Sequence, residues 1–346
     1  MKKIIKEFTP QGGRHCITTS LRQIFDYYGY TLSEAMLFGI GEGLDFTYIN
    51  LAAAPMVSGR TKIGEFEETL SGRLGITIRV KQAKDYSKVF AKAKQMIDSE
   101  HPVLAYVDMP YMEYLGMDKD SHFGGHTVVL FGYDDARQCF HVSERDHSDY
   151  PIRTPAGTIS KDYHLVPYDQ LETARSSNHR PFPANNKYLE FDFSGYAGIT
   201  PDNLALSIRA VCEKNLNPPT NLKGVNGILK FSKEVVKWNK FDSEKLKRAG
   251  VTNYFQINAD GGTGGGIFRA MYGEFLVEAA TVLQKDGISE IGQSFIALSG
   301  KWDVIAQKMW QLHETGDETL LKEMSGNISD NFNTEVDLLT RLQEIV

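Results

Sequence analysis

QGGRHCITTSLRQIFDYYGY, residues 11–30, decides how the first half of the chain folds. Its apolar side chains recur at the spacing of one helical face, at Ile17, Leu21, Ile24, Phe25 and Tyr28. This period predicts an amphipathic helix over residues 16–28, with Cys16 as its first residue. A thiol at a helix N-terminus meets unpaired backbone N–H groups and the positive end of the helix dipole, and both favour the nucleophilic thiolate. The stretch therefore makes Cys16 a candidate nucleophile.

A cysteine nucleophile needs a base, which is usually a histidine from elsewhere in the chain. HTVVLFGYDD (126–135) and CFHVSE (139–144) predict two strands joined by a short turn, a hairpin. His126 opens the first of these strands directly after two glycines, so we expect it to be rigidly held with room for a ligand. His126 is the candidate base.

The hairpin returns the end of its second strand towards His126, where an acceptor would orient the imidazole. Ser143, Glu144 and Asp146 all lie near that end. The spacing favours Glu144, with Asp146 in reserve. Gln11 stands five residues before Cys16, and we expect its amide to reach an oxyanion beside the Cys16 backbone N–H.

Each of these residues also has an ordinary structural interpretation. A lone cysteine at the head of a helix is more often a small buried apolar side chain, and a histidine at a strand start is usually structural. The two together, each behind a Gly-Gly pair, make the catalytic interpretation about as strong as the structural one. His15 is expected to be structural and Cys139 to be part of the core.

The remaining elements of the first half predict an α+β fold, because helices come first and strands follow. The expected elements are a helix at 31–38, an ordered Gly-rich loop at 38–49, a helix at 62–74, a strand at 76–83, a helix at 86–98 and a buried strand at 102–109.

A chain of 346 residues predicts two domains. We expect the first at 1–170, a connecting segment rich in Pro, Ser and Asn at 171–200, and a helical domain at 201–346. In the helical domain, apolar residues at i, i+4 spacing run from Ile267 to Leu283, and further helices are expected at 287–313 and 317–345.

The net charge of −6 and the pI of about 5.9 argue against a nucleic-acid partner, since such proteins usually present a basic face. Both values are compatible with a small-molecule substrate or an acidic protein partner. Three scattered cysteines form no disulfide framework and indicate a reducing compartment. The first residues, MKKIIKEFTP, lack the apolar region of a secretory signal, and no apolar run reaches membrane-spanning length, so we expect a cytoplasmic protein with no membrane partner.

Each of two glycine-rich loops allows a functional interpretation as well as one of ordinary close packing. FGIGEGLDF (38–46) would line a substrate pocket in which Glu42 or Asp45 binds a cationic amine, although a tightly packed loop is the simpler reading. DGGTGGGIFRAMY (260–272) places glycines before a helix, where a phosphate could bind near Arg269, and the alternative is a hinge or a close contact. No CxxC or HExxH motif is present, and His122 and His126 share a loop rather than a helix, so no metal is expected.

Several motifs together carry a resemblance to a known family. GRHCITTSLRQIFDYYG, LSEAMLFGIGEGLDFTY, GRTKIGEFEETLSGRLGI and GGHTVVLFGYDD resemble the N-terminal domain of the butirosin-biosynthesis protein H family. FQINADGGTGGGIFRAMYGEFLVEAA resembles the helical C-terminal domain found with it. Together they cover most of the chain, and their order makes the match fairly specific.

The resemblance implies a papain-like N-terminal domain related to the C39 peptidases, and acyl transfer rather than proteolysis. The acyl group would pass from the phosphopantetheine thioester of an acyl carrier protein to a small-molecule amine, with no permanently bound cofactor. Cys16 and His126 match the family's cysteine and histidine. The third position, usually aspartate in related peptidases, falls on Glu144, and Gln11 stands one residue closer to the cysteine than the papain-type oxyanion glutamine.

Two rival functions stay open at this point. One is a cysteine hydrolase of the C39 type acting on a peptide or thioester. The other is a non-catalytic binding module for carrier proteins or peptides. The sequence identifies neither the acyl donor nor the amine, and it leaves the role of the loop 261–266 and the oligomeric state open.

Overall fold

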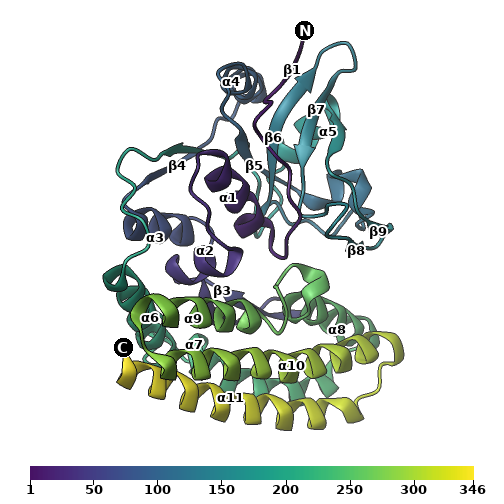
Figure 1. Cartoon of the computed structure of the whole chain (residues 1–346). Coiled ribbons are helices and arrows are strands. Elements are labelled where there is room, and N and C mark those ends of the chain that lie inside the picture. Colours follow the sequence, from purple (N-terminus) through teal and green to yellow (C-terminus); the bar gives the residue numbers. More distant parts are fainter. The chain divides into compact units, whose positions relative to one another are not determined.

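The computed structural model describes all 346 residues, Met1–Val346, and divides into two compact units. The first unit comprises Met1–Leu37 and Ile76–Tyr196, and the second comprises Phe38–Gly75 and Ala197–Val346. The mixture of helices and sheet expected from the sequence is confirmed, as is the helical C-terminal region (Figure 1). The unit boundaries differ from the expected ones, because residues 38–75 belong with the C-terminal helices.

An antiparallel sheet of seven strands forms the centre of the first unit. Its strands are β1 (Lys2–Ile4), β4 (Thr77–Lys81), β5 (Val103–Val107), β6 (His126–Asp134), β7 (Cys139–Ser143), β10 (His164–Pro167) and β11 (Tyr188–Asp192). They run in the order β10-β7-β6-β5-β11-β4, and β1 pairs with the end of β6. Every residue of β6 is buried, as its continuous apolar sequence requires. The expected hairpin is confirmed, with Leu130 opposite Val142.

Helices pack on this sheet and fix its ends. They are α1 (Cys16–Tyr27), α4 (Tyr86–Asp98) and α5 (Tyr168–Ser176), with α2 (Glu34–Ile40) beginning in this unit. The short elements are η1 (Met109–Tyr111), η2 (Glu113–Leu115) and the hairpin of β8 (Ile152–Thr154) with β9 (Gly157–Ile159). Helix α1 lies against β5 and β6 through its buried apolar face (Figure 1). This contact brings the start of α1 and the start of β6 into one region.

The segment 171–200, expected to connect two domains, contains part of the first unit's architecture. It holds most of α5 and all of β11, which pairs with both β4 and β5. The Pro- and Asn-rich stretch between them, which suggested a linker, is a loop that returns the chain to the sheet. The local composition therefore indicates a loop correctly, but the pairing of β11 depends on partners 83 to 115 residues earlier, from Tyr188 with Ala105 to Asp192 with Thr77.

The second unit consists of a helical bundle and one short β-hairpin that packs on it. Its helices are α3 (Glu65–Leu74), α6 (Pro201–Leu216), α7 (Gly224–Val235), η3 (Val236–Lys240), α8 (Ser243–Ile257), η4 (Ala259–Gly261), α9 (Arg269–Leu283), α10 (Asp286–Thr315) and α11 (Thr319–Ile345). Helix α10 packs between α9 and α11, which run beside it (Figure 1). The hairpin of β2 (Leu44–Asn50) and β3 (Pro55–Arg60) packs on α7 and α8, so the loop expected at 38–49 is wrong: it contains the end of α2 and most of β2.

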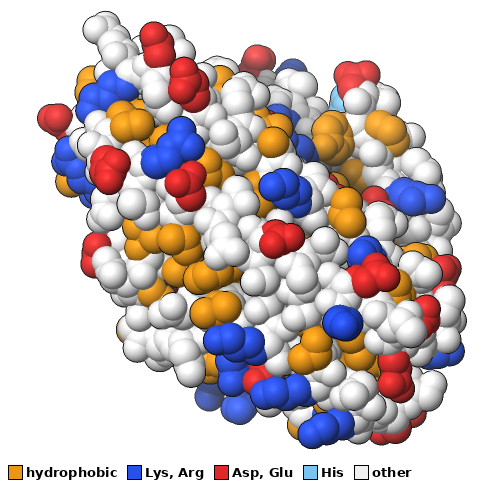
Figure 2. Space-filling model, turned by 90° about the horizontal axis from the view of Figure 1, so that it is seen from below, with side chains coloured by type: hydrophobic (Ala, Val, Ile, Leu, Met, Phe, Trp, Pro, Cys, Tyr) orange, Lys and Arg blue, Asp and Glu red, His pale blue; other side chains and the backbone are white.

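The surface carries charges of both signs interspersed with small apolar areas on the face shown in Figure 2. None of the helices is both long enough and apolar enough to span a bilayer.

Candidate active site

Cys16 is the first residue of α1 and is half-buried. His15 precedes it in an extended conformation, so the chain enters the helix directly at the cysteine. The packing of Leu21, Ile24 and Phe25, all fully buried, fixes the helix against the sheet. The thiol is thus held at the positive end of a rigid helix.

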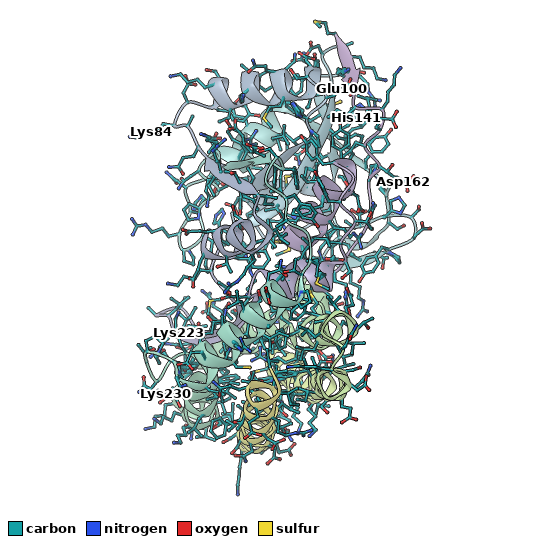
Figure 3. All side chains as sticks on the ribbon, turned by 60° about the vertical axis from the view of Figure 1, so that its left-hand side comes forward. Lys84, Glu100, His141, Asp162, Lys223 and Lys230 are labelled. Carbon is teal, nitrogen blue, oxygen red and sulfur yellow. The ribbon has the colours of Figure 1, made fainter.

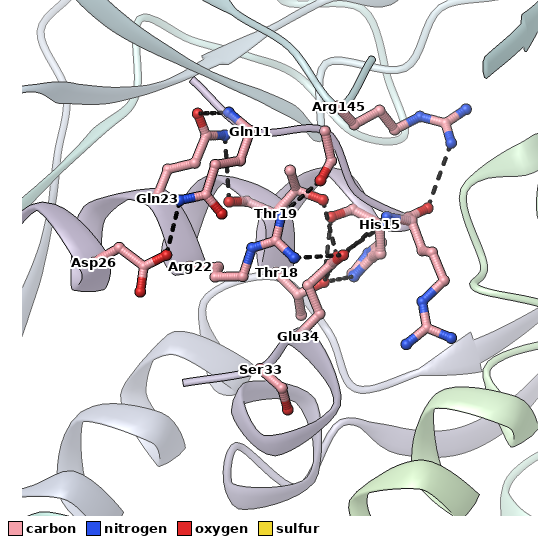
Figure 4. A network of polar contacts seen from close by, with 12 residues as sticks. Gln11, His15, Thr18, Thr19, Arg22, Gln23, Asp26, Ser33, Glu34 and Arg145 are labelled. Carbon is pink, nitrogen blue, oxygen red and sulfur yellow. Dashed lines mark hydrogen bonds and ion pairs between the residues drawn. The ribbon is translucent and has the colours of Figure 1, made fainter. Parts of the chain in front are cut away.

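A buried carboxylate fixes the chain just before Cys16. Glu34, at the start of α2, accepts hydrogen bonds from the backbone N–H groups of Arg14 and His15 at 3.0 and 3.3 Å (Figure 4). It also accepts the hydroxyl groups of Thr18 and Thr19 at 2.8 and 2.9 Å. Because four donors converge on one carboxylate, Glu34 ties the segment before α1 to two hydroxyl groups of the first turn of the helix.

Gly13 leaves room for the carboxylate of Glu34 beside the start of α1. A Cβ atom at Gly13 would lie 2.3 Å from Thr19 Oγ1 and 2.4 Å from Glu34 Oε1. The glycine is therefore required by the close approach of Glu34 and Thr19. His15, expected to be structural, is buried within the same network.

His126 is the first residue of β6 and is buried beside Cys16. Its Nε2 atom lies 2.7 Å from Oε2 of Glu144, and its ring also hydrogen-bonds the Cys16 side chain. Since Nε2 is engaged by Glu144, Nδ1 is the ring nitrogen left for the sulfur. The structure thus brings Cys16, His126 and Glu144 into one hydrogen-bonded chain, as the sequence predicted.

Glu144 follows β7 directly and is buried. Its Oε1 atom accepts the backbone N–H of Arg145 at 2.8 Å, and its Oε2 atom accepts the hydroxyl of Tyr114 at 3.1 Å in addition to His126. The carboxylate is therefore held by three donors from three segments of the chain.

The opposite charges of His126 and Glu144 stabilise each other, and this attraction outweighs the effect of burial on the pKa of each residue. Burial lowers the pKa of His126, but the negative charge of Glu144 and hydrogen bonds with Cys16 and Glu144 outweigh it and raise this pKa above its ordinary value. Burial likewise raises the pKa of Glu144, but the charge and hydrogen bond of His126 outweigh it and lower this pKa. The pair is therefore an imidazolium and a carboxylate at neutral pH, and an imidazolium beside a thiol favours the thiolate.

The alternatives to Glu144 have other partners. Asp146 accepts from Nε2 of His164 at 2.8 Å and from the backbone N–H of Lys161 at 2.8 Å. The hydroxyl of Ser143 donates to Oε1 of Gln23 at 2.6 Å. Of the three acceptors that the sequence left open, Glu144 is the one in contact with His126.

The prediction that Gln11 serves as an oxyanion donor is wrong. Its Nε2 atom donates to Oδ2 of Asp26 at 2.9 Å (Figure 4). Asp26 lies ten residues after Cys16 on α1, about 15 Å further along the helix axis. The segment before α1 therefore directs this side chain along the helix rather than to its start.

Arg269 is not available to a phosphate, which corrects a second prediction. Its guanidinium is fully buried in the second unit and forms an ion pair with Glu335, with 3.0 Å between Nε and Oε2. It also donates to the backbone carbonyls of Asp45 and Ile267. In the preceding loop, a Cβ atom at Gly266 would lie 2.3 Å from the Cα of Ser299 in α10. The glycines here serve a close contact between segments, which was the alternative reading.

The acidic residues of the other glycine-rich loop also have partners. Oε1 of Glu42 lies 2.6 Å from the guanidinium of Arg73, and Oδ1 of Asp45 accepts the N–H of Phe46 at 2.7 Å. A cationic amine would have to displace Arg73 to bind Glu42. The amine-binding role expected for Glu42 and Asp45 stays a prediction.

The remaining sequence candidates have structural surroundings. His122, four residues before His126, lies 2.9 Å from Asp108 through Nδ1 and stacks on His179 with 3.4 Å between ring centroids. Cys139 is buried in β7, as expected. Sequence reasoning missed Glu34 and Tyr114, because each reaches its partners across the fold.

Two family models match the chain. The model of butirosin biosynthesis protein H, N-terminal, matches residues 15–145, and that of a domain of unknown function (DUF4872) matches residues 169–342. The first match spans Cys16, His126 and Glu144, and the second spans the helices of the C-terminal region. No curated protein gives a significant match.

Proposed function

The chain belongs to the butirosin biosynthesis protein H family, and from this premise we propose that it is a cysteine-dependent acyltransferase acting in antibiotic biosynthesis. The donor is an acyl thioester of phosphopantetheine on an acyl carrier protein, and the acceptor is a small-molecule amine. The observation that carries the proposal is the hydrogen-bonded chain of Cys16, His126 and Glu144. The proposal includes a papain-like arrangement, in which a helix headed by the nucleophile packs on a sheet that supplies the base.

The first half-reaction forms an acyl-enzyme. The Cys16 thiolate attacks the thioester carbonyl carbon, and a tetrahedral intermediate carries the negative charge on the former carbonyl oxygen. When the bond from that carbon to the pantetheine sulfur breaks, the His126 imidazolium gives its proton to the leaving thiolate. The acyl group is then joined to the Cys16 sulfur, and His126 is neutral.

The second half-reaction forms the amide. The neutral imidazole of His126 accepts a proton from the amine as its nitrogen attacks the acyl-enzyme carbonyl. The bond from carbon to the Cys16 sulfur breaks, which restores the thiolate beside the imidazolium. One thioester and one amine yield one amide and one free pantetheine thiol, so atoms and charge balance.

Oxyanion stabilisation falls to the start of α1 in this proposal, because Gln11 lies elsewhere. The carbonyl carbon attacked by Cys16 sits at the helix N-terminus, where the dipole and the backbone N–H groups favour developing negative charge. Glu34, at the start of α2, supports this end of the helix by holding the segment before it. The whole arrangement costs little reorganisation during the reaction because it is preformed.

A basic segment of the second unit supports an acidic carrier protein as donor. Residues 223–248 hold eight Lys and Arg against three Asp and Glu, in a chain whose net charge is −6. Lys223 and Lys230 lie on the outer side of the helical unit (Figure 3). Val236 within this segment and Leu222 directly before it are 37% and 39% exposed, so they offer apolar surface beside the charges. Such a surface complements an acidic protein with an exposed apolar side chain.

The test is intact mass spectrometry after mixing the protein with a panel of acyl-pantetheine thioesters, with and without amines. We expect an acyl adduct on Cys16 that disappears as amide forms. Cys16→Ala should abolish the adduct and His126→Ala should slow it strongly, whereas Cys139→Ala, in the same unit but in β7, should retain it.

Three outcomes separate the proposal from its rivals. Amide product that depends on Cys16 supports acyl transfer. Thioester loss at a rate unaffected by amines, with free acid as product, would establish the hydrolase. No adduct and no thioester loss, with pantetheine or with acylated carrier protein, would leave only the binding module.

A further inference from the structure

A tyrosine connects the candidate active site to a second histidine–carboxylate pair. Tyr114, in η2, donates its hydroxyl to Oε2 of Glu144 at 3.1 Å. Its ring stacks on the ring of His164, with 3.9 Å between centroids and 19° between planes. His164 in turn lies 2.8 Å from Oδ1 of Asp146 through Nε2. Tyr114 therefore contacts both pairs, His126–Glu144 through its hydroxyl and His164–Asp146 through the face of its ring.

The second pair is built as firmly as the first. Asp146 and His164 are buried, and the second carboxylate oxygen of Asp146 accepts the Lys161 N–H at 2.8 Å. His164 belongs to β10 and stands opposite Val142 of β7, two residues before Glu144. The Tyr114 ring thus rests on a fixed surface, and its hydroxyl is aimed at a fixed atom.

We infer that Tyr114 is a positioning residue for the catalytic histidine, acting through Glu144; this rests on the proposed roles of Cys16 and His126. Oε2 of Glu144 receives both the His126 ring and the Tyr114 hydroxyl, while Oε1 receives the Arg145 N–H. Three donors in different directions fix the plane of the carboxylate. A fixed carboxylate fixes the direction of the imidazole and keeps the proton on His126 rather than on Glu144.

Tyr114, Glu144 and His126 form an assembly that is faced by charged or titratable groups from several elements. Cys16 faces His126 from α1 and Tyr114 faces Glu144 from η2. Arg145 and Asp146 follow Glu144, and each acts on the assembly through its charge, Arg145 on Glu144 and Asp146 on Tyr114. His164 from β10 completes the set by stacking on Tyr114. Of these contacts, the Tyr114 hydroxyl is the one that a single-atom change removes without altering a charge at neutral pH.

The test is the pH dependence of Cys16 alkylation by iodoacetamide, which needs no knowledge of the substrate. Tyr114→Phe removes the hydroxyl but keeps the ring on His164. We expect the acid-side midpoint of the alkylation rate to rise by about one pH unit, because Glu144 loses one of the three donors that stabilise its charge. Tyr133→Phe is the matched control, since the ring of Tyr133 is also buried and its hydroxyl also donates to a carboxylate, that of Asp98 at 2.7 Å, within the same unit.

A second measurement keeps the inference testable whatever the effect on stability. In the Glu144→Gln background, Tyr114→Phe should produce less than a third of the midpoint shift it gives in the wild type, because its effect passes through the carboxylate. Tyr133→Phe should leave the midpoint unchanged in both backgrounds. Melting temperatures of all variants, taken under the same conditions, identify any that are unfolded.

The outcomes separate this inference from the proposed function. If the wild-type midpoint is depressed and Tyr114→Phe leaves it unchanged, or shifts it equally with and without Glu144, the positioning role is wrong and the proposed function stands. If wild-type Cys16 alkylates like an ordinary cysteine, with a midpoint near 8.5, then both fail, because no ion pair exists for Tyr114 to position.

Discussion

Nε2 of His126 and Oε2 of Glu144 lie 2.7 Å apart, although the residues are 18 positions apart in the chain. The distance follows from the hairpin of β6 and β7, in which Val129 stands opposite Ser143 and brings the end of β7 back to the start of β6. The histidine is therefore the first residue of one buried strand, and its carboxylate directly follows the adjacent buried strand. A rigid mount of this kind is what an orienting contact in a catalytic site requires.

Glu144→Gln should reduce acyl transfer by about 10² to 10⁴-fold, by analogy with the loss when a triad carboxylate becomes an amide. The amide keeps the size of the side chain but removes the charge that holds His126 as an imidazolium. The measurement is kcat/KM against pH for wild type and variant. Asp146→Asn, at the reserve position, should have a much smaller effect, and equal losses in the two variants would contradict the assignment of Glu144.

The same pair should stabilise the fold in a defined pH window. The pKa of His126 is raised, so its contribution is fully present below about pH 6.5, the unfolded value, and is lost as the pH rises through the folded value. The pKa of Glu144 is lowered, so its contribution is fully present above about pH 4.3 and is lost as the pH falls through the folded value. The pair therefore stabilises most between about pH 4.3 and 6.5.

Urea unfolding of wild type and Glu144→Gln from pH 4 to 10 measures this window. Within this window the variant should have a free energy of unfolding about 3 kcal/mol lower than wild type, because removing one partner leaves a buried charge unpaired. The difference should become smaller as the pH rises above the window. Glu7→Gln, at an exposed position of the same unit, should show no such pH dependence. A difference that grows steadily with pH would contradict the charge states assigned to the pair.

Gly13→Ala should destabilise the first unit by about 1–3 kcal/mol, because the new methyl group would overlap Glu34 and Thr19. It should also slow Cys16 alkylation, since the overlap displaces Glu34 from the segment directly before the nucleophile. Gly72→Ala is the control: a Cβ there, in α3, meets nothing within 4 Å. That helical substitution should stabilise by about 0.5–1 kcal/mol and leave alkylation unchanged. Thermal melting measures the stability of both variants, and alkylation rates measure the reactivity of Cys16. A Gly13→Ala variant as stable as wild type would show that the contacts of Glu34 and Thr19 with this position are not rigid.

The parts of the site that follow local patterns could be predicted from the sequence, and the parts made by long-range contacts could not. Cys16 and His126 each begin a regular element whose period is visible in the sequence, and a short hairpin ties Glu144 to His126. Tyr114 reaches Glu144 from a 3₁₀ turn 30 residues away, with no periodicity to mark it.

The errors have the same physical origin. Gln11 was assigned by its distance in sequence from Cys16, but Asp26 on the same helix binds its amide. Arg269 was assigned by the glycines before it, but those glycines serve close packing, and Glu335 pairs with the guanidinium. In each case a polar partner remote in sequence decided the side-chain direction, because a buried polar group must be satisfied wherever a partner is found.

The Arg269–Glu335 pair should act as a structural contact of the second unit. Both side chains are fully buried, so Arg269→Met should leave the Glu335 carboxylate without its charge partner and cost about 3–5 kcal/mol. Arg269→Met combined with Glu335→Leu should recover much of the loss, because apolar side chains of similar volume need no charge partner. Lys308→Met, which breaks an exposed ion pair with Glu323, is the control and should cost less than about 1 kcal/mol. Urea unfolding followed by the helical circular dichroism signal measures all three. If Arg269→Met instead unfolds at the same urea concentration as wild type, the buried pair does not stabilise the second unit.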